Sequence, residues 1–321
     1  MNVLVTGGAG FIGSHLCEFL LSKGDSVVAV DILCGGSMEN ISNIQGHCNF
    51  RFYETDVLNI KQMRVILQEN KIDIVYHLAS NTDVSKGEES YIFDFQQTFE
   101  TTLTVLRLIR EFSISKLFFS SSSTIYGEVM QPISEANCNI RPISYYGASK
   151  LASEAFISAF AEKYNVQVWI ARFANVVGSR MTHGVIFDFI KKIKNNPNEL
   201  LILGNKETIK PFVYIDDVIN GIGLIIEKAA EPYNVFVIGN DSETSIQSIA
   251  RMVIREMELN TKIIYAKEGK SWLGDIEKYR CSNEKIKQLG WEIAYTSDVA
   301  VLKTIRSLLN SNSVKCYEKN I

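Results

Sequence analysis

A glycine-rich turn near the start of the chain constrains the fold most strongly. A short β-branched run, Val3–Thr6, leads into Gly7–Gly13, and the apolar spacing after it predicts a helix over Phe11–Lys23. Glycines between a strand and a helix allow a sharp turn and let a diphosphate approach the amides at the helix N-terminus. This order favours a dinucleotide-binding unit over a purely structural turn.

An acidic residue ends the next predicted strand, Ser26–Asp31. A carboxylate at the end of this strand, as Asp31 is, accepts hydrogen bonds from ribose hydroxyls in dinucleotide-binding folds. It also repels a 2′-phosphate, so the sequence favours NAD over NADP as the cofactor. The alternative is a structural turn followed by an unrelated acid.

Apolar strands and amphipathic helices alternate over the first half of the chain. Further segments are expected as strands at Phe50–Thr55, Ile72–Leu78, Lys116–Ser121 and Val166–Arg172, and as helices at Asn59–Asn70, Tyr91–Glu111 and Ser144–Tyr164. Repeated β-α-β units place strands in parallel through right-handed crossovers. The pattern predicts an α/β fold, a doubly wound parallel Rossmann sheet with helices on both faces.

The regularity weakens after Arg172, and Phe173–Thr182 is expected to be irregular. The later segments are expected as one strand, Asn234–Ile238, and as helices at Gly184–Asn195, Asp216–Ala229, Thr244–Glu256, Asn283–Leu289 and Ser297–Leu309. A polar, frayed tail is expected over Asn310–Ile321.

Composition excludes several classes of protein. Of the 321 residues 46% are hydrophobic, which is ample for a large core, and the net charge of −3 offers no field for nucleic acid or an anionic membrane. No apolar run reaches the roughly 18 residues of a membrane span. The six scattered cysteines and the absence of a secretory leader predict reduced thiols in a cytoplasmic protein. No His/Cys cluster has metal-ligand spacing, so no metal is expected.

Tyr146 and Lys150 are candidates for acid–base chemistry. They are four residues apart near the start of a predicted helix and therefore share a face. An ammonium nearby lowers the pKa of a phenol, which suits Tyr146 to act as a general base. The preceding strand ends in the hydroxyl run Ser120–Thr124, at the sheet edge where ligands bind. One of these hydroxyls is expected to polarise the reacting oxygen; the alternative is a capping cluster.

Seven motifs together resemble one family, the extended short-chain dehydrogenase/reductases, and within it the NAD-dependent nucleotide-sugar epimerase/dehydratase group. The motifs are TGGAGFIGSH (Thr6–His15), Asp56-Val57, HLAS (His77–Ser80), SSSSTIYGE (Ser120–Glu128), YYGASK (Tyr145–Lys150), RFANVVG (Arg172–Gly178) and FVYIDDV (Phe212–Val218). The resemblance covers about residues 1–309. It is specific for fold and cofactor and much less so for the sugar.

The resemblance implies a role for individual residues. Those expected to bind NAD are Gly7, Gly10, Phe11, Ile12, Gly13, Asp31, Asp56, Val57, Leu78, Ala79, Ser80, Tyr146 and Lys150. Those expected to be catalytic are Ser122, Tyr146 and Lys150. Those expected at the substrate are Ser122, Ser123, Thr124, Asn175, Arg180, Lys210 and Asp275.

Three departures from the family pattern stand out. Dehydratases of the family carry Asp-Glu after the catalytic hydroxyl, whereas this chain has Ser123 and Thr124, which argues against 4,6-dehydration. Lys210 and Trp272 stand where arginines are common, and lysine offers phosphate a point charge in place of a bidentate fork. Thr98 occupies the place of the usual helix asparagine.

The resemblance therefore implies C4 epimerisation of a nucleotide-diphospho-sugar through a transient 4-keto intermediate, with Tyr146 as base, Ser122 as polariser and NAD kept bound. The rivals are a 4-dehydrogenase or ketoreductase with net redox chemistry, a dehydratase or decarboxylase, and a non-catalytic NAD-binding sensor.

Motif order also predicts how the chain is divided and assembled. Residues 1–171 and 211–240 are expected to form the NAD domain, and residues 172–210 and 241–321 a smaller α/β substrate lobe. Relatives usually dimerise through a four-helix bundle, here formed by the helices at Tyr91–Glu111 and Ser144–Tyr164. The apolar stripe would be Phe95, Phe99, Leu103, Phe156 and Phe160, which otherwise simply face the sheet.

Overall fold

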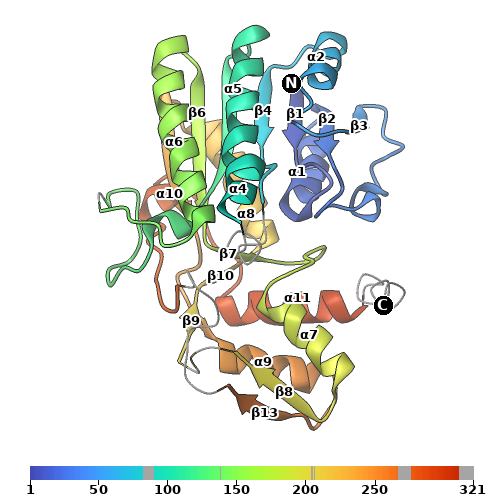
Figure 1. Ribbon diagram of the computed structural model, residues 1–321, viewed down its shortest axis with the longest axis vertical. Coiled ribbons are helices and arrows are strands. Elements are labelled where there is room, and N and C mark those ends of the chain that lie inside the picture. The colour runs from blue at the N-terminus through green and yellow to red at the C-terminus, as the bar shows by residue number, and fades with distance from the viewer. Residues whose placement is uncertain (82–89, 138, 204, 206, 267–275, 311–321) are drawn as a thin grey trace.

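The computed structural model of the protein describes residues 1–81, 90–137, 139–203, 205, 207–266 and 276–310. Its centre is a seven-stranded parallel sheet with the strand order β11-β6-β5-β4-β1-β2-β3 (Figure 1). The strands are β1 (Asn2–Thr6), β2 (Ser26–Asp31), β3 (Phe50–Glu54), β4 (Ile74–His77), β5 (Lys116–Ser122), β6 (Gln167–Phe173) and β11 (Tyr233–Ile238). The order reverses between β1 and β4, and ligands of such sheets bind outside the strand ends at that point.

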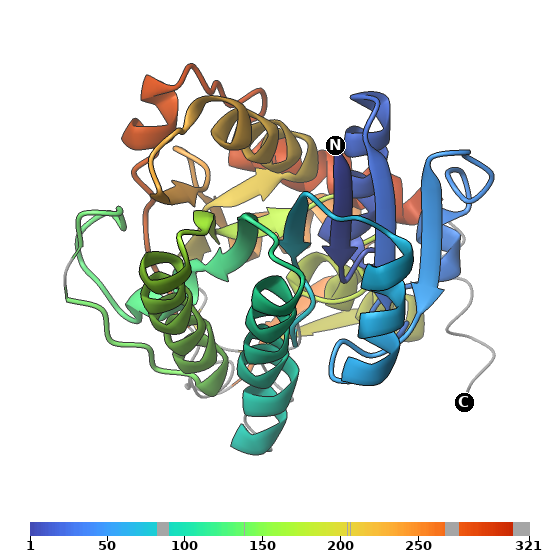
Figure 2. The same ribbon diagram turned by 90° about the horizontal axis from the view of Figure 1, so that it is seen from above.

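Both faces of the sheet are covered by helices because its strands are apolar on both sides. In β1, Val3 and Val5 join the core shared with the helices α1 (Phe11–Ser22) and α8 (Ile215–Lys228). Leu4 points to the opposite face and packs with the helices on that side. These are α2 (Ile60–Glu69), α5 (Thr101–Glu111) and α6 (Tyr145–Tyr164). Figure 2 shows α6, α5 and α2 side by side along this face. The predicted doubly wound fold is confirmed.

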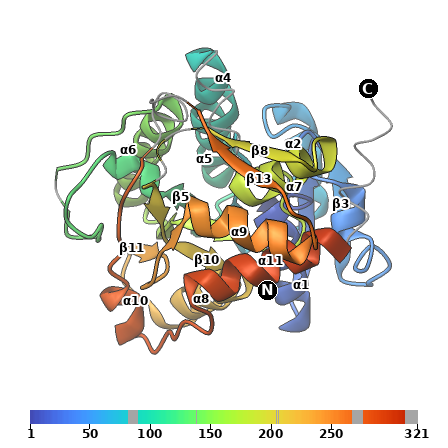
Figure 3. The same ribbon diagram turned by 90° about the horizontal axis from the view of Figure 1, so that it is seen from below.

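A smaller lobe lies beyond the carboxyl ends of the strands (Figures 1 and 3). Its helices are α7 (Val185–Asn195), α9 (Ile246–Glu256) and α11 (Ser297–Asn310), with the short α10 (Glu284–Gln288) beside β11. Three two-stranded sheets join it: β7 (Asn175–Val177) with β10 (Phe212–Tyr214), β9 (Ile209–Lys210) with β12 (Thr244–Ser245), and β8 (Glu199–Ile202) with β13 (Lys262–Tyr265). The predicted α/β character of this lobe is confirmed.

The structure differs from two of the predicted elements. The helix expected over Tyr91–Glu111 is continuous but changes its winding: α4 (Tyr91–Asp94) passes into a π-helical segment, η2 (Phe95–Glu100), before α5. The segment expected to be irregular, Phe173–Thr182, contains β7, which is three residues long and too short to leave an alternating pattern. The tail from residue 311 onward lies outside the described residues.

Candidate active site

The glycine-rich turn has the shape of a diphosphate cradle. Gly7 adopts a φ of +72°, and a side chain at Gly13 would bring its Cβ to 2.0 Å from the Gly7 carbonyl oxygen. The helix α1 begins at Phe11 after Gly10, and no side chain caps it. The first amides of α1 are therefore left to a ligand, and an anion is the ligand that helix N-termini prefer. This turn fits the diphosphate of NAD.

Asp31 ends β2 beside this turn and is buried. Its Oδ2 accepts a hydrogen bond from the Ala9 amide at 3.0 Å and its Oδ1 one from the Leu33 amide at 2.8 Å. Burial raises the pKa of Asp31, and these backbone hydrogen bonds oppose the rise. The carboxylate is thus fixed at the strand end where a ribose hydroxyl would meet it.

The other residues expected at the cofactor lie around the same strand ends. After β4, the Ala79 amide donates to Thr6 Oγ1 at 3.2 Å, and a Cβ on Gly7 would lie 2.9 Å from that amide nitrogen. Leu78 and Ser80 flank Ala79 and are partly buried. After β3, Asp56 accepts from the Leu58 amide at 2.8 Å and Val57 is buried. The segments after β1 and β4 are therefore in contact at the switch point.

Three side chains meet where β5 ends and α6 begins. Ser122 is the last residue of β5, and its hydroxyl is hydrogen-bonded to the hydroxyl of Tyr146. Tyr146 lies in the first turn of α6, which Ser144 caps by accepting a backbone amide hydrogen at 3.1 Å. Lys150, one turn further, donates from Nζ to the Ser120 carbonyl at 2.7 Å. The structure thus brings together the Ser, Tyr and Lys that the sequence singles out.

Burial dominates the electrostatics of this group. It raises the pKa of Tyr146 to about 12; the hydrogen bond with Ser122 opposes this rise, and the charge of Asp94 adds to it. Burial lowers the pKa of Lys150 to about 7, while the charge of Glu154 acts in the opposite direction. Among the described residues, it is the hydrogen bond with Ser122 that lowers the pKa of Tyr146 and so favours the ionised form that a general base requires.

The hydroxyls that follow Ser122 face a second polar group. Thr124 donates from Oγ1 to Ser122 Oγ at 2.9 Å. Ser123 donates to the hydroxyl of Tyr279 at 3.4 Å, and Asn175 of β7 donates to the same hydroxyl at 2.8 Å. Tyr279 therefore joins the end of β5 to β7. Sequence reasoning missed Tyr279, since no motif near it signals a role.

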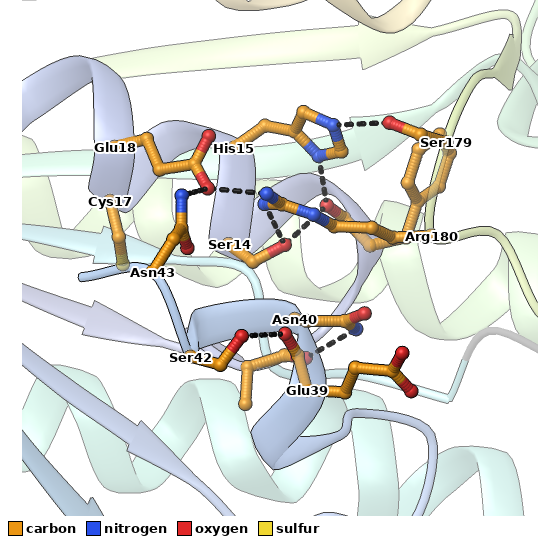
Figure 4. A network of polar contacts seen from close by, with 12 residues as sticks. Ser14, His15, Cys17, Glu18, Glu39, Asn40, Ser42, Asn43, Ser179 and Arg180 are labelled. Carbon is orange, nitrogen blue, oxygen red and sulfur yellow. Dashed lines mark hydrogen bonds and ion pairs between the residues drawn. The ribbon is translucent and has the colours of Figure 1, made fainter. Parts of the chain in front are cut away.

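The remaining substrate candidates are placed differently. Lys210 ends β9 directly before Pro211, whose carbonyl accepts a hydrogen bond from Asn175 at 3.3 Å. Arg180 instead pairs with Glu18 and donates to Ser14 Oγ at 3.1 Å, so its guanidinium is bonded to α1 (Figure 4). The sequence had placed Arg180 at the substrate. Asp275 and Trp272 lie outside the described residues.

A buried carboxyl that the sequence did not single out lies near Tyr146. Asp94 of α4 is fully buried, and its Oδ1 accepts from Asn81 Nδ2 at 2.7 Å. Among the described residues its Oδ2 has no hydrogen-bond partner, and burial raises the pKa of Asp94. Thr98, which stands in place of the family's usual helix asparagine, accepts a hydrogen bond from the Asn81 amide at 3.3 Å. Thr98 thus holds the chain after β4.

A buried ion pair lies behind Lys150. Arg172 of β6 donates to both carboxylate oxygens of Glu154, with distances of 2.6 to 3.2 Å, and Ser121 Oγ donates to Glu154 at 2.5 Å. Arg172 Nη1 also donates to the Tyr126 hydroxyl at 2.7 Å. Glu154 follows Lys150 by one helical turn, a spacing from which its place could have been inferred. The pair joins β5, β6 and α6 directly behind the catalytic candidates.

Across the described ranges, no group of three or more His, Cys, Asp or Glu side chains is arranged to hold a metal ion. No helix among the same residues has the length and apolar character needed to cross a membrane.

Comparison with known proteins places this geometry in a family. Residues 3–239 match the family model described as the NAD dependent epimerase/dehydratase family. A crystal structure of UDP-glucose 4-epimerase with UDP-glucose from Thermotoga maritima superposes with a TM-score of 0.86 at 30% identity, covering 96% of this chain and 99% of that one.

Two curated relatives carry other names. UDP-glucuronic acid decarboxylase 1 of Xenopus tropicalis is 30% identical over 95% of this chain and 71% of its own length. The dTDP-D-glucose 4,6-dehydratase of Homo sapiens is 27% identical over 95% of this chain and 89% of its own length. Since the family model covers most of the chain, the cofactor is NAD, and this protein belongs to the NAD-dependent epimerase/dehydratase family of nucleotide-sugar enzymes.

Proposed function

We propose that this chain catalyses C4 epimerisation of a nucleotide-diphospho-sugar through a transient 4-keto intermediate. The observation that carries the proposal is the group Ser122, Tyr146 and Lys150, followed by hydroxyls in place of a carboxylate pair. Ser123 and Thr124 cannot donate and accept a proton as Asp and Glu do, so the site has base and polariser without the acid–base pair for loss of water.

Each residue has a distinct task in this proposal. Tyr146 removes the proton of the 4-hydroxyl, and Ser122 donates a hydrogen bond to the oxygen that becomes the carbonyl. The Nζ atom of Lys150 lies 5.8 Å from the centre of the Tyr146 ring, so the protonated form of Lys150 would favour ionised Tyr146. NAD held by the Gly7–Gly13 turn and Asp31 would supply the acceptor for the hydride from C4 and the means of its return to the opposite face of the sugar.

The substrate diphosphate requires local groups because the chain has a net charge of −3. We assign binding of the diphosphate to Asn175, which donates to the Pro211 carbonyl, and to Lys210, which directly precedes Pro211. We assign binding of the nucleotide to Asp275. Tyr279, bonded to Asn175, is placed to touch the same ligand.

We further propose the division of the chain into residues 1–171 plus 211–240 for NAD and 172–210 plus 241–321 for the substrate. The pairing of β11 with β6 supports the return of the chain to the NAD domain. β10 pairs instead with β7, so the segment around residue 212 is shared between the two.

We propose a homodimer formed through α4, η2 and α6. Tyr91, Phe95 and Phe156 are 61%, 46% and 52% exposed, which is unusual for large apolar side chains. Phe99 packs between Phe95 and Phe156, with ring centres 5.7 and 5.0 Å apart, so the exposed rings form one surface. A second copy of the same surface would bury it. We also propose a cytoplasmic location, which fits the finding that the buried cysteines Cys17 and Cys281 form no disulfide within the described residues.

A substrate panel tests the proposed reaction. The purified protein is incubated with UDP-, GDP-, CDP- and dTDP-sugars, and product mass, stereochemistry and nicotinamide absorbance are followed. We expect a C4 epimer of unchanged mass without accumulation of NADH. Accumulated NADH and a keto-sugar would select a dehydrogenase, and a product lighter by water or CO₂ would select a dehydratase or decarboxylase.

A further inference from the structure

One carboxylate on α1 connects three separate segments of the chain. Glu18 pairs with the guanidinium of Arg180, which lies between β7 and α7 on the way into the substrate lobe. The same oxygen, Oε1, accepts from Asn43 Nδ2 at 2.8 Å, and Asn43 lies in the loop that follows β2 and Asp31. Figure 4 shows Arg180 and Asn43 converging on Glu18 from opposite sides. We infer that Glu18 is a positioning residue that couples the cofactor side of the site to the substrate lobe.

The substrate-lobe segment is held on α1 by neighbouring contacts. Arg180 adopts a φ of +68°, a left-handed conformation that is unfavourable for a residue with a side chain. Its bonds to Glu18 and to Ser14 Oγ offset that cost. The preceding Ser179 shares a hydrogen bond of 3.0 Å with His15 Nε2. A strained backbone held by specific contacts marks a segment whose position matters.

The residues that make these contacts, Ser14 and His15, also bond to the end of the glycine-rich turn, Gly7–Gly13. Ser14 Oγ donates to the Phe11 carbonyl at 3.2 Å, and His15 Nδ1 contacts the same oxygen at 2.8 Å. A Cβ on Gly178 would lie 3.4 Å from the Phe11 ring, so the substrate-lobe segment passes against this side chain. Phe11 begins α1, where the diphosphate of NAD is expected. The position of the turn and that of the lobe segment are therefore linked.

The loop after β2 rests on the same turn from the other side. Asn40 Nδ2 donates to the Ala9 carbonyl at 2.9 Å, and the Ser37 amide donates to that oxygen at 3.0 Å. Asp31, at the start of this loop, accepts from the Ala9 amide. NAD bound against Asp31 would thus fix the loop, and through Asn43 and Glu18 would fix Arg180.

Glu18 therefore links the two ligands thermodynamically. When NAD binds, it orders the loop after β2 and the glycine-rich turn, so the nucleotide-sugar loses less conformational entropy when it binds afterwards. The coupling is reciprocal, because the nucleotide-sugar strengthens the binding of NAD by the same factor. The inference rests on the proposed function for the class of the second ligand, a nucleoside diphosphate. We expect a nucleoside diphosphate to slow the release of NAD by about tenfold, within the usual range of coupling between sites.

The test measures release of NAD from the holoenzyme, with released NAD captured by alcohol dehydrogenase and ethanol as absorbing NADH. The probes are UDP, GDP, CDP and dTDP. In the wild type the nucleotide that binds slows release about tenfold; in Glu18→Gln it slows release less than about twofold. The matched control is Glu111→Gln, which breaks a somewhat more exposed, bidentate pair with Arg64, between α2 and α5. This control is expected to behave as the wild type does.

A second variant keeps the test independent of how well Glu18→Gln folds. Arg180→Met removes the same ion pair from the lobe side and is expected to lose the nucleotide effect equally. In Glu18→Gln the KM for the nucleotide-sugar rises while kcat stays within about twofold. A full nucleotide effect in either variant, or no effect of any nucleotide on the wild type, would overturn the inference. Because release needs no turnover, a failed epimerase assay does not affect this result.

Discussion

The ammonium group of Lys150 lies 5.8 Å from the centre of the Tyr146 ring and 4.9 Å from that of Phe119, closed in by α6 and β5. Tyr146 is partly buried at this position and Lys150 is fully buried. Burial pushes the pKa of Tyr146 up and that of Lys150 down, so both are driven toward their neutral forms. Tyr146 can therefore remove a proton only where neighbouring groups, such as the Ser122 hydroxyl, lower its pKa.

Removing the Tyr146 hydroxyl is the simplest test of its role. Tyr146→Phe should lower kcat by about 10³-fold or more, because general-base catalysis contributes on that order. NAD should stay bound, since the glycine turn and Asp31 are untouched. The control is Tyr145→Phe, whose ring is 55% exposed and packs on Tyr91; its activity should match the wild type. Wild-type turnover by Tyr146→Phe would end the assignment.

The charge of Asp94 should be visible in the pH profile. An ionised Asp94 raises the pKa of Tyr146, and Tyr146 must lose its proton to act. Asp94→Asn removes that charge, so the acidic limb of kcat/KM should shift toward lower pH. Asp25→Asn, at the opposite edge of the sheet beside the N-terminal amine, serves as the control. If the acidic limb of the Asp94→Asn profile stays in place or shifts toward higher pH, the charge of Asp94 does not control the ionisation of Tyr146.

The buried pair of Glu154 and Arg172 should dominate stability near the site. Both side chains are under 10% exposed, and breaking such a pair leaves an uncompensated charge. Glu154→Gln should cost about 3–5 kcal/mol in the free energy of unfolding. Glu111→Gln breaks an ion pair on the surface and should lower the free energy of unfolding far less. Urea denaturation measures both, and equal losses would show that burial of the pair does not matter.

The proposed dimer surface can be disrupted by one charge. Phe156→Glu places a carboxylate among the exposed rings of α4, η2 and α6, where the partner copy would desolvate it. Sedimentation equilibrium should find a dimer for the wild type and a monomer for this variant. Val65→Glu, at a position of α2 that is 50% exposed, should remain a dimer. A monomeric wild type refutes the proposed surface.

The sheet could be predicted because its central strands contain short, mostly apolar runs, as in Ser26–Asp31, where prediction and structure agree. Strands buried on both faces leave this strong pattern. The substrate lobe could not be predicted in detail, since β7, β9, β10 and β12 have two or three residues each.

The same contrast holds in the candidate site. Ser122, Tyr146 and Lys150 belong to local motifs and could be selected from the sequence. Tyr279 and Asp94 reach the site only through the tertiary fold, Tyr279 from more than 150 residues beyond Ser123. Arg180 was expected at the substrate from the family resemblance, and its partner Glu18 lies 162 positions away in the chain. A local motif does not reveal a partner so distant in sequence.

The most direct test of the central claim follows the hydrogen at C4. A nucleotide-sugar deuterated at C4, chosen from the substrate panel, is converted and the product is analysed by mass spectrometry and NMR. The account predicts an epimer of unchanged mass that retains deuterium at C4, because the hydride is returned to the carbon it left. Deuterium found in released NADH, or a product that has lost water or CO₂, would contradict it.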